Sequence, residues 1–199
     1  MIMKVIGVTG GVGAGKSTVL DYIEKNCNCR IILSDKVAND IKLKGQPCYE
    51  PIVSLLSTEV LDVNGEIDKA KMASMIFSDE GLLSKVNDIL HPAVNRFIFD
   101  QIEEERKKNT LDYLFIEAAL LIENGYDKIV DEMWYVYADE EVRRQRLKAS
   151  RGYSDKKIDD ILKGQLSDEE FRQHADFVID NSGDVEGMHR CIDLKLGEN

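Results

Sequence analysis

The sequence has little positive charge. It carries 26 Lys and Arg against 37 Asp and Glu, which gives a formal net charge of −11 over 199 residues. A surface that binds the phosphates of nucleic acid needs the opposite balance, so this composition disfavours a nucleic-acid partner. An acidic chain still binds a small anion wherever basic residues gather locally.

Long apolar runs are also missing. A helix that crosses a bilayer needs about 20 apolar residues, and the most apolar stretch, LFIEAALLI, is interrupted by Glu117. The apolar run after Lys4 reaches glycine too early to form the core of a signal peptide. We therefore expect no membrane partner and a cytoplasmic location. The hydrophobic content of 43% suffices for a buried core.

Cysteine is scarce and lacks the spacing of a metal site. Cys27 and Cys29 form a C-x-C pair, whereas Cys48 and Cys191 stand alone. A zinc site needs further Cys or His at ligand spacing, and none follows. We interpret all four as reduced thiols, as is usual in the cytosol.

Short apolar segments rich in β-branched residues alternate with helical stretches. Strands are expected at residues 4–9, 30–34, 112–117, 133–138 and 176–180, with a helix at 17–26 after the first of them. This alternation predicts an α/β fold with a five-stranded parallel sheet and right-handed crossovers. The chain is expected to form one unit.

Two segments are too long for simple crossovers. Residues 37–110 read as several helices, one of which is expected to begin at Pro92, and the turn VNGE (63–66) divides the segment. Residues 139–164 are highly charged and include RRQRLKASRG. We interpret both as insertions at one edge of the sheet.

The most informative motif is GGVGAGKS, residues 10–17, which matches G-x-x-x-x-G-K-[ST] at every fixed position. Glycines let successive backbone N–H groups turn toward one anion, and the following helix points its N-terminal donors at the same anion. Lys16 is expected to reach the β- and γ-phosphates of a nucleotide, and the Ser17 hydroxyl to bind Mg²⁺. The nucleotide contacts are expected from Gly11, Gly13, Ala14, Gly15, Lys16, Ser17 and Thr18.

The loop alone leaves kinases, ATPases and GTPases open. A GTPase usually reads guanine with N-K-x-D, which is absent, and DVEG (184–187) follows the last expected strand, where a switch element does not belong. A GTPase is therefore disfavoured.

Two acidic residues follow expected strands. Asp35 comes directly after the second strand, on the edge where ligands of open α/β sheets bind, so it could accept the proton of an attacking hydroxyl. It could equally cap a helix that starts near Lys36. Glu117 ends the third strand and is either a Mg²⁺ ligand or a solvated strand end.

Basic residues gather at Arg143, Arg144, Arg146, Lys148 and Arg151. Arginine suits bidentate phosphate contacts, so one or two of them could close over the nucleotide. The alternative is a solvated helix face that pairs with Glu140 and Glu141. The role of His91 also has two alternatives, a structural side chain or a contact with a ligand.

The chain resembles the dephospho-coenzyme A kinase family along nearly its whole length. The resemblance rests on five stretches in family order: GVTGGVGAGKST, SDKVAND, ILHPAV, EAALLIEN and HADFVIDNSG. The glycine loop is shared with many kinases, but the combination of the other four is specific to this family.

The resemblance implies transfer of the γ-phosphoryl of ATP to the ribose 3′-hydroxyl of dephospho-coenzyme A, with Mg²⁺. It implies a nucleotide core of residues 1–36, 111–138 and 165–199, a substrate-binding insertion of residues 37–110 and a lid of residues 139–164. Asp35 and Lys16 would be catalytic, and Ser17 and Glu117 would bind the metal. ATP would also be contacted by Arg144 and Arg146, and the acceptor by Asp35, Lys69, His91, Glu117, Leu120 and Glu123. A monomer or weak oligomer is expected.

The chain departs from the family pattern in three places. Glu117-Ala118-Ala119 stands where the family has Asp-x-Pro, Lys69 replaces an arginine, and Arg146 and Arg151 are one residue further apart than the usual pair. Two other functions remain open: a P-loop kinase for a different small molecule, and a nucleotide-gated switch. The long helical insertion disfavours the first, because it suits a bulky acceptor.

Overall fold

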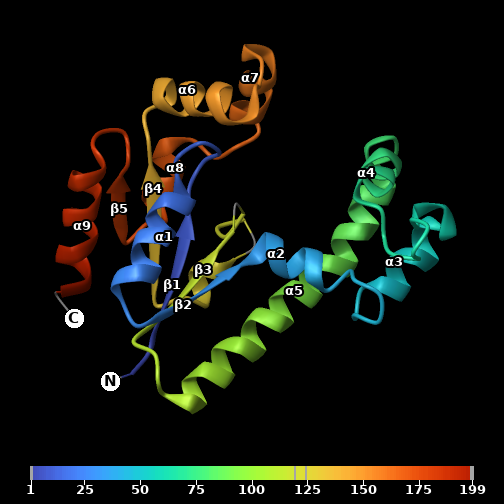
Figure 1. Ribbon diagram of the computed structural model, residues 1–199, viewed down its shortest axis with the longest axis horizontal. Coiled ribbons are helices and arrows are strands. Elements are labelled where there is room, and N and C mark those ends of the chain that lie inside the picture. The colour runs from blue at the N-terminus through green and yellow to red at the C-terminus, as the bar shows by residue number, and fades with distance from the viewer. Residues whose placement is uncertain (1, 119, 124, 198–199) are drawn as a thin grey trace. The chain divides into compact units, whose positions relative to one another are not determined.

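The computed structural model describes residues 2–118, 120–123 and 125–197. The chain forms two compact units (Figure 1). The first unit consists of Met1–Ile31 and Lys108–Asn199, and the second consists of Ile32–Lys107.

A five-stranded sheet with the strand order β2-β3-β1-β4-β5 organises the first unit. The pairs β1–β3, β1–β4 and β4–β5 are all parallel, which confirms the expected α/β fold. β1 lies at the centre, where Val8 aligns with Glu117 of β3 and Thr9 with Tyr135 of β4. The strands are β1 (Lys4–Thr9), β2 (Cys29–Leu33), β3 (Tyr113–Glu117), β4 (Glu132–Tyr137) and β5 (Phe177–Asp180), each within a residue of its expected ends.

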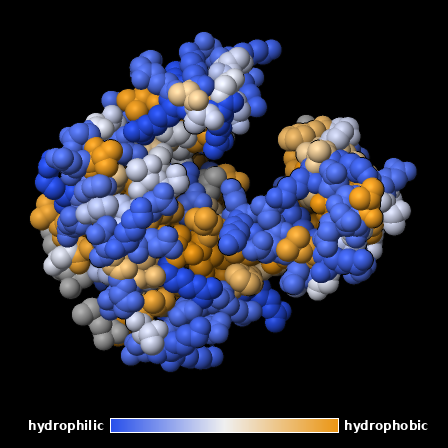
Figure 2. All heavy atoms as spheres, viewed as in Figure 1, coloured by the Kyte–Doolittle hydropathy of each residue, from blue (hydrophilic) through white to orange (hydrophobic). Residues whose placement is uncertain are grey.

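The helices of this unit begin and end on recognisable signals. Ser154 and Ser167 cap the helices α7 and α8, and Ser167 forms a reciprocal capping box with Glu170. On the face shown in Figure 2, α6 and α7 present mostly hydrophilic side chains. The helices are α1 (Lys16–Asn26), α6 (Glu140–Arg151), α7 (Asp155–Lys163), α8 (Asp168–Gln173) and α9 (Val185–Gly197), with a 3₁₀ turn η2 (Tyr126–Lys128).

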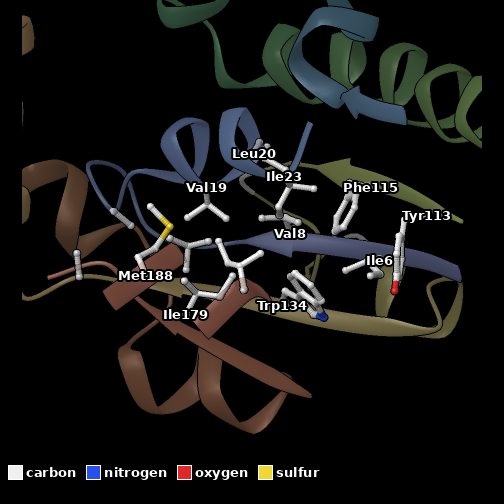
Figure 3. Close-up of a cluster of buried hydrophobic side chains, with 14 residues drawn as sticks. Ile6, Val8, Val19, Leu20, Ile23, Tyr113, Phe115, Trp134, Ile179 and Met188 are labelled. Carbon is white, nitrogen blue, oxygen red and sulfur yellow. The ribbon is translucent and has the colours of Figure 1, made fainter. Parts of the chain in front are cut away.

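The core of the first unit fixes β1 between its neighbours. Val19, Leu20 and Ile23 form the buried side of α1 and belong to one apolar cluster with side chains of β1, β3, β4, β5 and α9 (Figure 3). Trp134 is fully buried, with its ring 5.5 Å from that of Phe115 and in an edge-to-face arrangement. Because both ends of the glycine loop continue into these buried elements, the loop has a rigid frame.

The second unit is helical, as expected for residues 37–110. Its elements are α2 (Ser34–Asp40), α3 (Tyr49–Leu56), a 3₁₀ turn η1 (Thr58–Val60), α4 (Lys69–Phe77) and α5 (Glu80–Lys108). An isolated antiparallel bridge between Leu61 and Ile67 closes the expected VNGE turn, in which Gly65 has a φ of 76°.

The expectation that a new helix begins at Pro92 is wrong. α5 runs without interruption through Pro92 for 29 residues. Proline removes the N–H that would bond to the carbonyl of Asp88 and its ring crowds that carbonyl, so packing has to outweigh both costs. Val86, Val94 and Ile98, all buried, continue on both sides of Pro92. Within the described residues, neither this helix nor any other has the length and apolar character needed to cross a bilayer.

Candidate active site

The glycine loop links the end of β1 to the start of α1. The Ala14 N–H donates to the Gly11 carbonyl at 3.1 Å, and the Val19 N–H donates to the Gly15 carbonyl at 3.2 Å. Gly15 has φ 90° and ψ 32°, a left-handed conformation that glycine adopts without strain. A Cβ at this position would lie 2.2 Å from Asn181 Nδ2, so the loop also needs the space that glycine leaves.

Lys16 is held between the loop and β3. Its ammonium donates to the Gly10 carbonyl at 2.8 Å and lies 3.5 Å from Glu117 Oε1. Both side chains are largely buried, with exposed fractions of 14% and 17%. The parallel register explains the pairing, because Glu117 aligns with Val8 two residues before the loop. The structure therefore brings together two of the residues expected at the site.

Arg146 and Asn181 converge on one loop carbonyl. Asn181 Nδ2 donates to the Ala14 carbonyl at 2.8 Å, and Arg146 Nη1 donates to the same oxygen at 3.2 Å. Arg146 Nη2 also donates to the Asn181 carbonyl at 2.8 Å. Asn181 is buried and sequence reasoning missed it, although it follows β5 in the stretch that carries the family resemblance. These bonds hold the Ala14 carbonyl in a fixed direction.

Arg143 and Gln165 make a second pair of contacts, at Val12. Arg143 Nε donates to the Val12 carbonyl at 3.0 Å, while Gln165 Oε1 accepts from the Val12 N–H at 3.2 Å and from Arg143 Nη2 at 2.7 Å. The guanidinium covers Gly11, where a Cβ would lie 2.3 Å from Nη2. Burial lowers the pKa of Arg143. Arg143 belongs to the basic cluster from which nucleotide contacts were expected, although Arg144 and Arg146 were the two named, whereas Gln165 was not expected at the site.

The other basic residues of α6 point elsewhere. Arg144 donates to Glu140 at 2.8 Å, as expected if it belongs to a solvated helix face, and to Asp159 at 2.6 Å. The described hydrogen bonds include none from Arg144 to the loop. Lys148 pairs with Asp155 at 2.6 Å, and the Arg151 guanidinium lies 5.8 Å from the Tyr153 ring centre. The two arginines that reach the loop, Arg143 and Arg146, are three residues apart and share one helix face.

The first turn of α1 and the end of β3 supply oxygen donors suited to a magnesium ion. Ser17 and Thr18 are exposed at the N-terminus of α1, and Glu117 ends β3. Hydroxyl and carboxylate oxygens are the ligands that Mg²⁺ prefers, with water completing its shell, so this donor set fits the ion. Thr9, the last residue of β1, is fully buried, and its hydroxyl has no hydrogen-bond partner within the described residues.

The segment after β3 carries the remaining expected residues of the first unit. Ala118 and Leu121 are buried, Leu120 is 48% exposed, and Glu123 is exposed in a turn. Ala119 lies outside the described residues.

In the second unit, Asp35 lies in the first turn of α2 and is exposed. The N-cap position of this helix is Leu33, and no side chain caps it, so the capping role considered for Asp35 does not hold. Lys69 is the first residue of α4, whose cap is Asp68, and His91 is exposed on α5.

Lys42 is a charged residue that sequence reasoning missed. It is half-buried just after α2, and burial and then the charge of Lys69 lower its pKa, while Cys48 and Asp35 act in the opposite direction. The charges of Lys69 and Asp35 thus both act on Lys42, the first by repulsion and the second by attraction. Such an arrangement favours an anion.

A glycine loop at the end of a central parallel strand, with a lysine at the start of the next helix, defines a P-loop nucleotide-binding protein. The model of the family described as dephospho-CoA kinase matches residues 4–187. The dephospho-CoA kinase of Aquifex aeolicus is 38% identical over 191 residues, which cover 96% of this chain and 94% of that protein. This chain belongs to the dephospho-CoA kinase family.

Solved structures agree on the fold. A protein from Thermus thermophilus is 26% identical, with a TM-score of 0.82 over 100% of this chain and 98% of that one. The dephospho-CoA kinase from Campylobacter jejuni is 23% identical, with a TM-score of 0.73 over 98% of each chain, and this likeness concerns the fold alone.

Proposed function

We propose that this protein transfers the γ-phosphoryl group of ATP to the 3′-hydroxyl of the ribose of dephospho-coenzyme A, giving coenzyme A and ADP. The observation that carries the proposal is the complete phosphate loop, with Lys16 held between Gly10 and Glu117, in a chain that matches this kinase family over residues 4–187.

In the proposed reaction, the acceptor oxygen bonds to the γ-phosphorus while the bond from that phosphorus to the β–γ bridging oxygen breaks. The loop N–H groups and the N-terminus of α1 bind the phosphates, and the Lys16 ammonium moves from its contacts with Gly10 and Glu117 to the β- and γ-oxygens. Its charge offsets the negative charge that develops on the leaving ADP.

Asp35 is the proposed base. It follows β2 by two residues, and the carboxyl ends of parallel strands are where ligands of such sheets bind. Its carboxylate accepts the hydroxyl proton as the new bond forms. Phosphoryl transfer depends mainly on positioning and charge neutralisation, so an ordinary carboxylate suffices for this late proton transfer.

Ser17 and Glu117 are the proposed magnesium ligands. When bound, the ion neutralises charge on the β- and γ-phosphates. Binding of the acceptor is assigned to Lys69, His91, Leu120 and Glu123 together with Asp35 and Glu117. Arg146 is the proposed ATP contact of the lid, in preference to Arg144, because it already touches the loop. The proposal includes a cytoplasmic location and a monomer or weak oligomer.

The test measures ADP release from Mg-ATP with dephospho-coenzyme A, AMP, gluconate or no acceptor. Turnover that depends on dephospho-coenzyme A is expected. Turnover with a different acceptor would keep a kinase but remove the assigned substrate, and hydrolysis independent of any acceptor would indicate a nucleotide switch.

Two variants separate the assigned roles. Lys16→Ala is expected to abolish transfer, because the loop loses its charge. Asp35→Asn is expected to lose most turnover while ATP still binds, because only the base is changed. Wild-type turnover by Asp35→Asn would show that Asp35 is not the base.

A further inference from the structure

One oxygen in the first unit receives two donors that both belong to the nucleotide site. Gln165 Oε1 accepts from the Val12 N–H at 3.2 Å and from Arg143 Nη2 at 2.7 Å. Gln165 lies between α7 and α8, far from Val12 in the sequence, so this contact is specific to the fold. Two converging donors on one oxygen are the arrangement that a phosphate oxygen also accepts.

Arg143, like Arg146, has only neutral hydrogen-bond acceptors among the described residues. Its hydrogen bonds within the described residues go to two neutral oxygens, those of Val12 and Gln165. Arg144 and Arg172, by contrast, each donate to a carboxylate. An anionic acceptor adds the attraction between opposite charges, and phosphate oxygens match the planar donors of a guanidinium in a bidentate geometry. The side chain of Arg143 is therefore poised to exchange Gln165 for an anion.

The position of Val12 identifies which phosphate this anion would be. The Lys16 ammonium, which is proposed to reach the β- and γ-oxygens, donates to the Gly10 carbonyl at 2.8 Å, at the β1 end of the loop. Val12 follows at this same end, and Arg143 covers Gly11 beside it. The terminal phosphate is therefore the group that would lie at this end.

We propose that Gln165 Oε1 occupies the place of a γ-phosphate oxygen of ATP, and that Arg143 is a catalytic residue that contacts the γ-phosphoryl group during transfer. This inference rests on the proposed function. On binding, the γ-phosphate displaces Gln165 and takes both of its donors. Arg143 then donates to the equatorial oxygens of the γ-phosphoryl group while the bond between the γ-phosphorus and ADP breaks and the bond between the γ-phosphorus and the acceptor oxygen forms.

The first experiment measures ATP and ADP affinities by calorimetry for Gln165→Met and Gln165→Glu. Methionine has similar length but no competing acceptor, so ATP is expected to bind about three- to tenfold more tightly. Glutamate forms an ion pair with Arg143 that ATP must break, so ATP is expected to bind about tenfold or more weakly. ADP lacks the γ-phosphate, and its affinity is expected to stay within about twofold.

The matched control is Gln145, which is exposed on α6 and donates to Glu141 at 3.1 Å. Gln145→Met and Gln145→Glu are expected to leave both affinities unchanged. If both Gln165 variants weaken ATP and ADP alike, Gln165 only supports the loop and the inference is wrong. If the wild-type protein binds no ATP, the proposed function fails together with the inference, and this outcome needs no variant.

The second experiment concerns Arg143. Arg143→Ala is expected to lower kcat by on the order of 10³-fold, with a much smaller change in ADP affinity, and Arg143→Lys to restore part of kcat. The control is Arg190→Ala, which removes an exposed arginine of α9 that pairs with Glu186 at 3.8 Å. A kcat for Arg143→Ala within about fivefold of wild type would overturn the catalytic assignment.

Discussion

Replacing Gly15 with alanine tests how the phosphate loop is held. Gly15 has φ 90° and ψ 32°, which costs a residue with a Cβ about 1–2 kcal/mol. The new Cβ would lie 2.2 Å from Asn181 Nδ2, so the amide must leave the Ala14 carbonyl. Since Arg146 still donates to that carbonyl, the lost hydrogen bond adds about 1 kcal/mol. The expected loss of stability is about 2–3 kcal/mol.

Gly152 provides a matched control. It ends α6 with φ 62° and ψ 27°, nearly the same backbone conformation, but a Cβ there meets nothing within 4 Å. Gly152→Ala should therefore cost only the conformational part, about 1–2 kcal/mol. Urea unfolding measures both, with fluorescence of the single tryptophan, Trp134, as the probe, because this residue is buried in the unit that contains the loop.

A double-mutant cycle isolates the steric part. In an Asn181→Ala background the Cβ at residue 15 no longer meets the amide, so Gly15→Ala should cost about 1 kcal/mol less than in the wild type. ATP affinity should fall for Gly15→Ala and stay the same for Gly152→Ala. Equal losses of stability for the two glycines, with no coupling to Asn181, would refute this account of the loop.

Three further predictions concern charges and buried polar groups. Lys42→Met should raise the urea midpoint at pH 7 and weaken acceptor binding. Because burial and the charge of Lys69 lower the pKa of Lys42, the charged side chain destabilises the folded protein below that pKa. The gain in stability should therefore shrink as pH rises toward about 10.4, the pKa of an unperturbed lysine, and a gain independent of pH would contradict this account. Glu132→Gln should cost about 1–2 kcal/mol at pH 7. Although burial alone would raise the pKa of Glu132, hydrogen bonds from Trp134 and two lysines lower it, so in unfolding curves the loss should begin to shrink as pH falls below about 4.3 and vanish below the lowered pKa. Thr9→Val removes a buried hydroxyl without a partner in the described residues and should add about 1 kcal/mol of stability by the same assay, whereas a loss would reveal a partner.

The sequence was sufficient for features set by local pattern. Short β-branched runs predicted the five strands to within a residue, and the fixed positions of the glycine loop identified Lys16, because both signals are contiguous along the chain. The pairing of Lys16 with Glu117 also follows from a simple rule, since Glu117 ends β3 and Lys16 closes the loop that begins where the neighbouring parallel strand β1 ends.

Other features depend on distant contacts. Gln165 and Asn181 reach the loop from 153 and 167 residues away. Asn181 lies in a stretch that carries the family resemblance, but no local pattern marks either residue as a contact of the loop. The sequence also suggested Arg144 rather than Arg143 as a contact of the nucleotide. Three arginines of α6 lie within four positions, and the orientation of the helix about its axis, which local sequence does not determine, decides which of them face the loop. Pro92 was expected to begin a helix, but buried side chains on both sides of it keep α5 continuous.

The central position of β1 has a consequence for synthesis on the ribosome. The first strand to emerge has to pair with β3 and β4, and Lys4 meets its partner Tyr113 only after the whole second unit has been made. At 5–20 residues per second, an apolar strand and its glycine loop wait roughly 5–20 s for their neighbours. The unit that separates them is helical. Because the hydrogen bonds of helices join residues close in sequence, we expect this unit to fold during that time. The glycine loop is thus among the first segments to be translated, but the sheet around it forms only after β3 and β4 have been made. Slower translation of residues 32–107 should therefore lengthen the time for which β1 is exposed to aggregation and to chaperones.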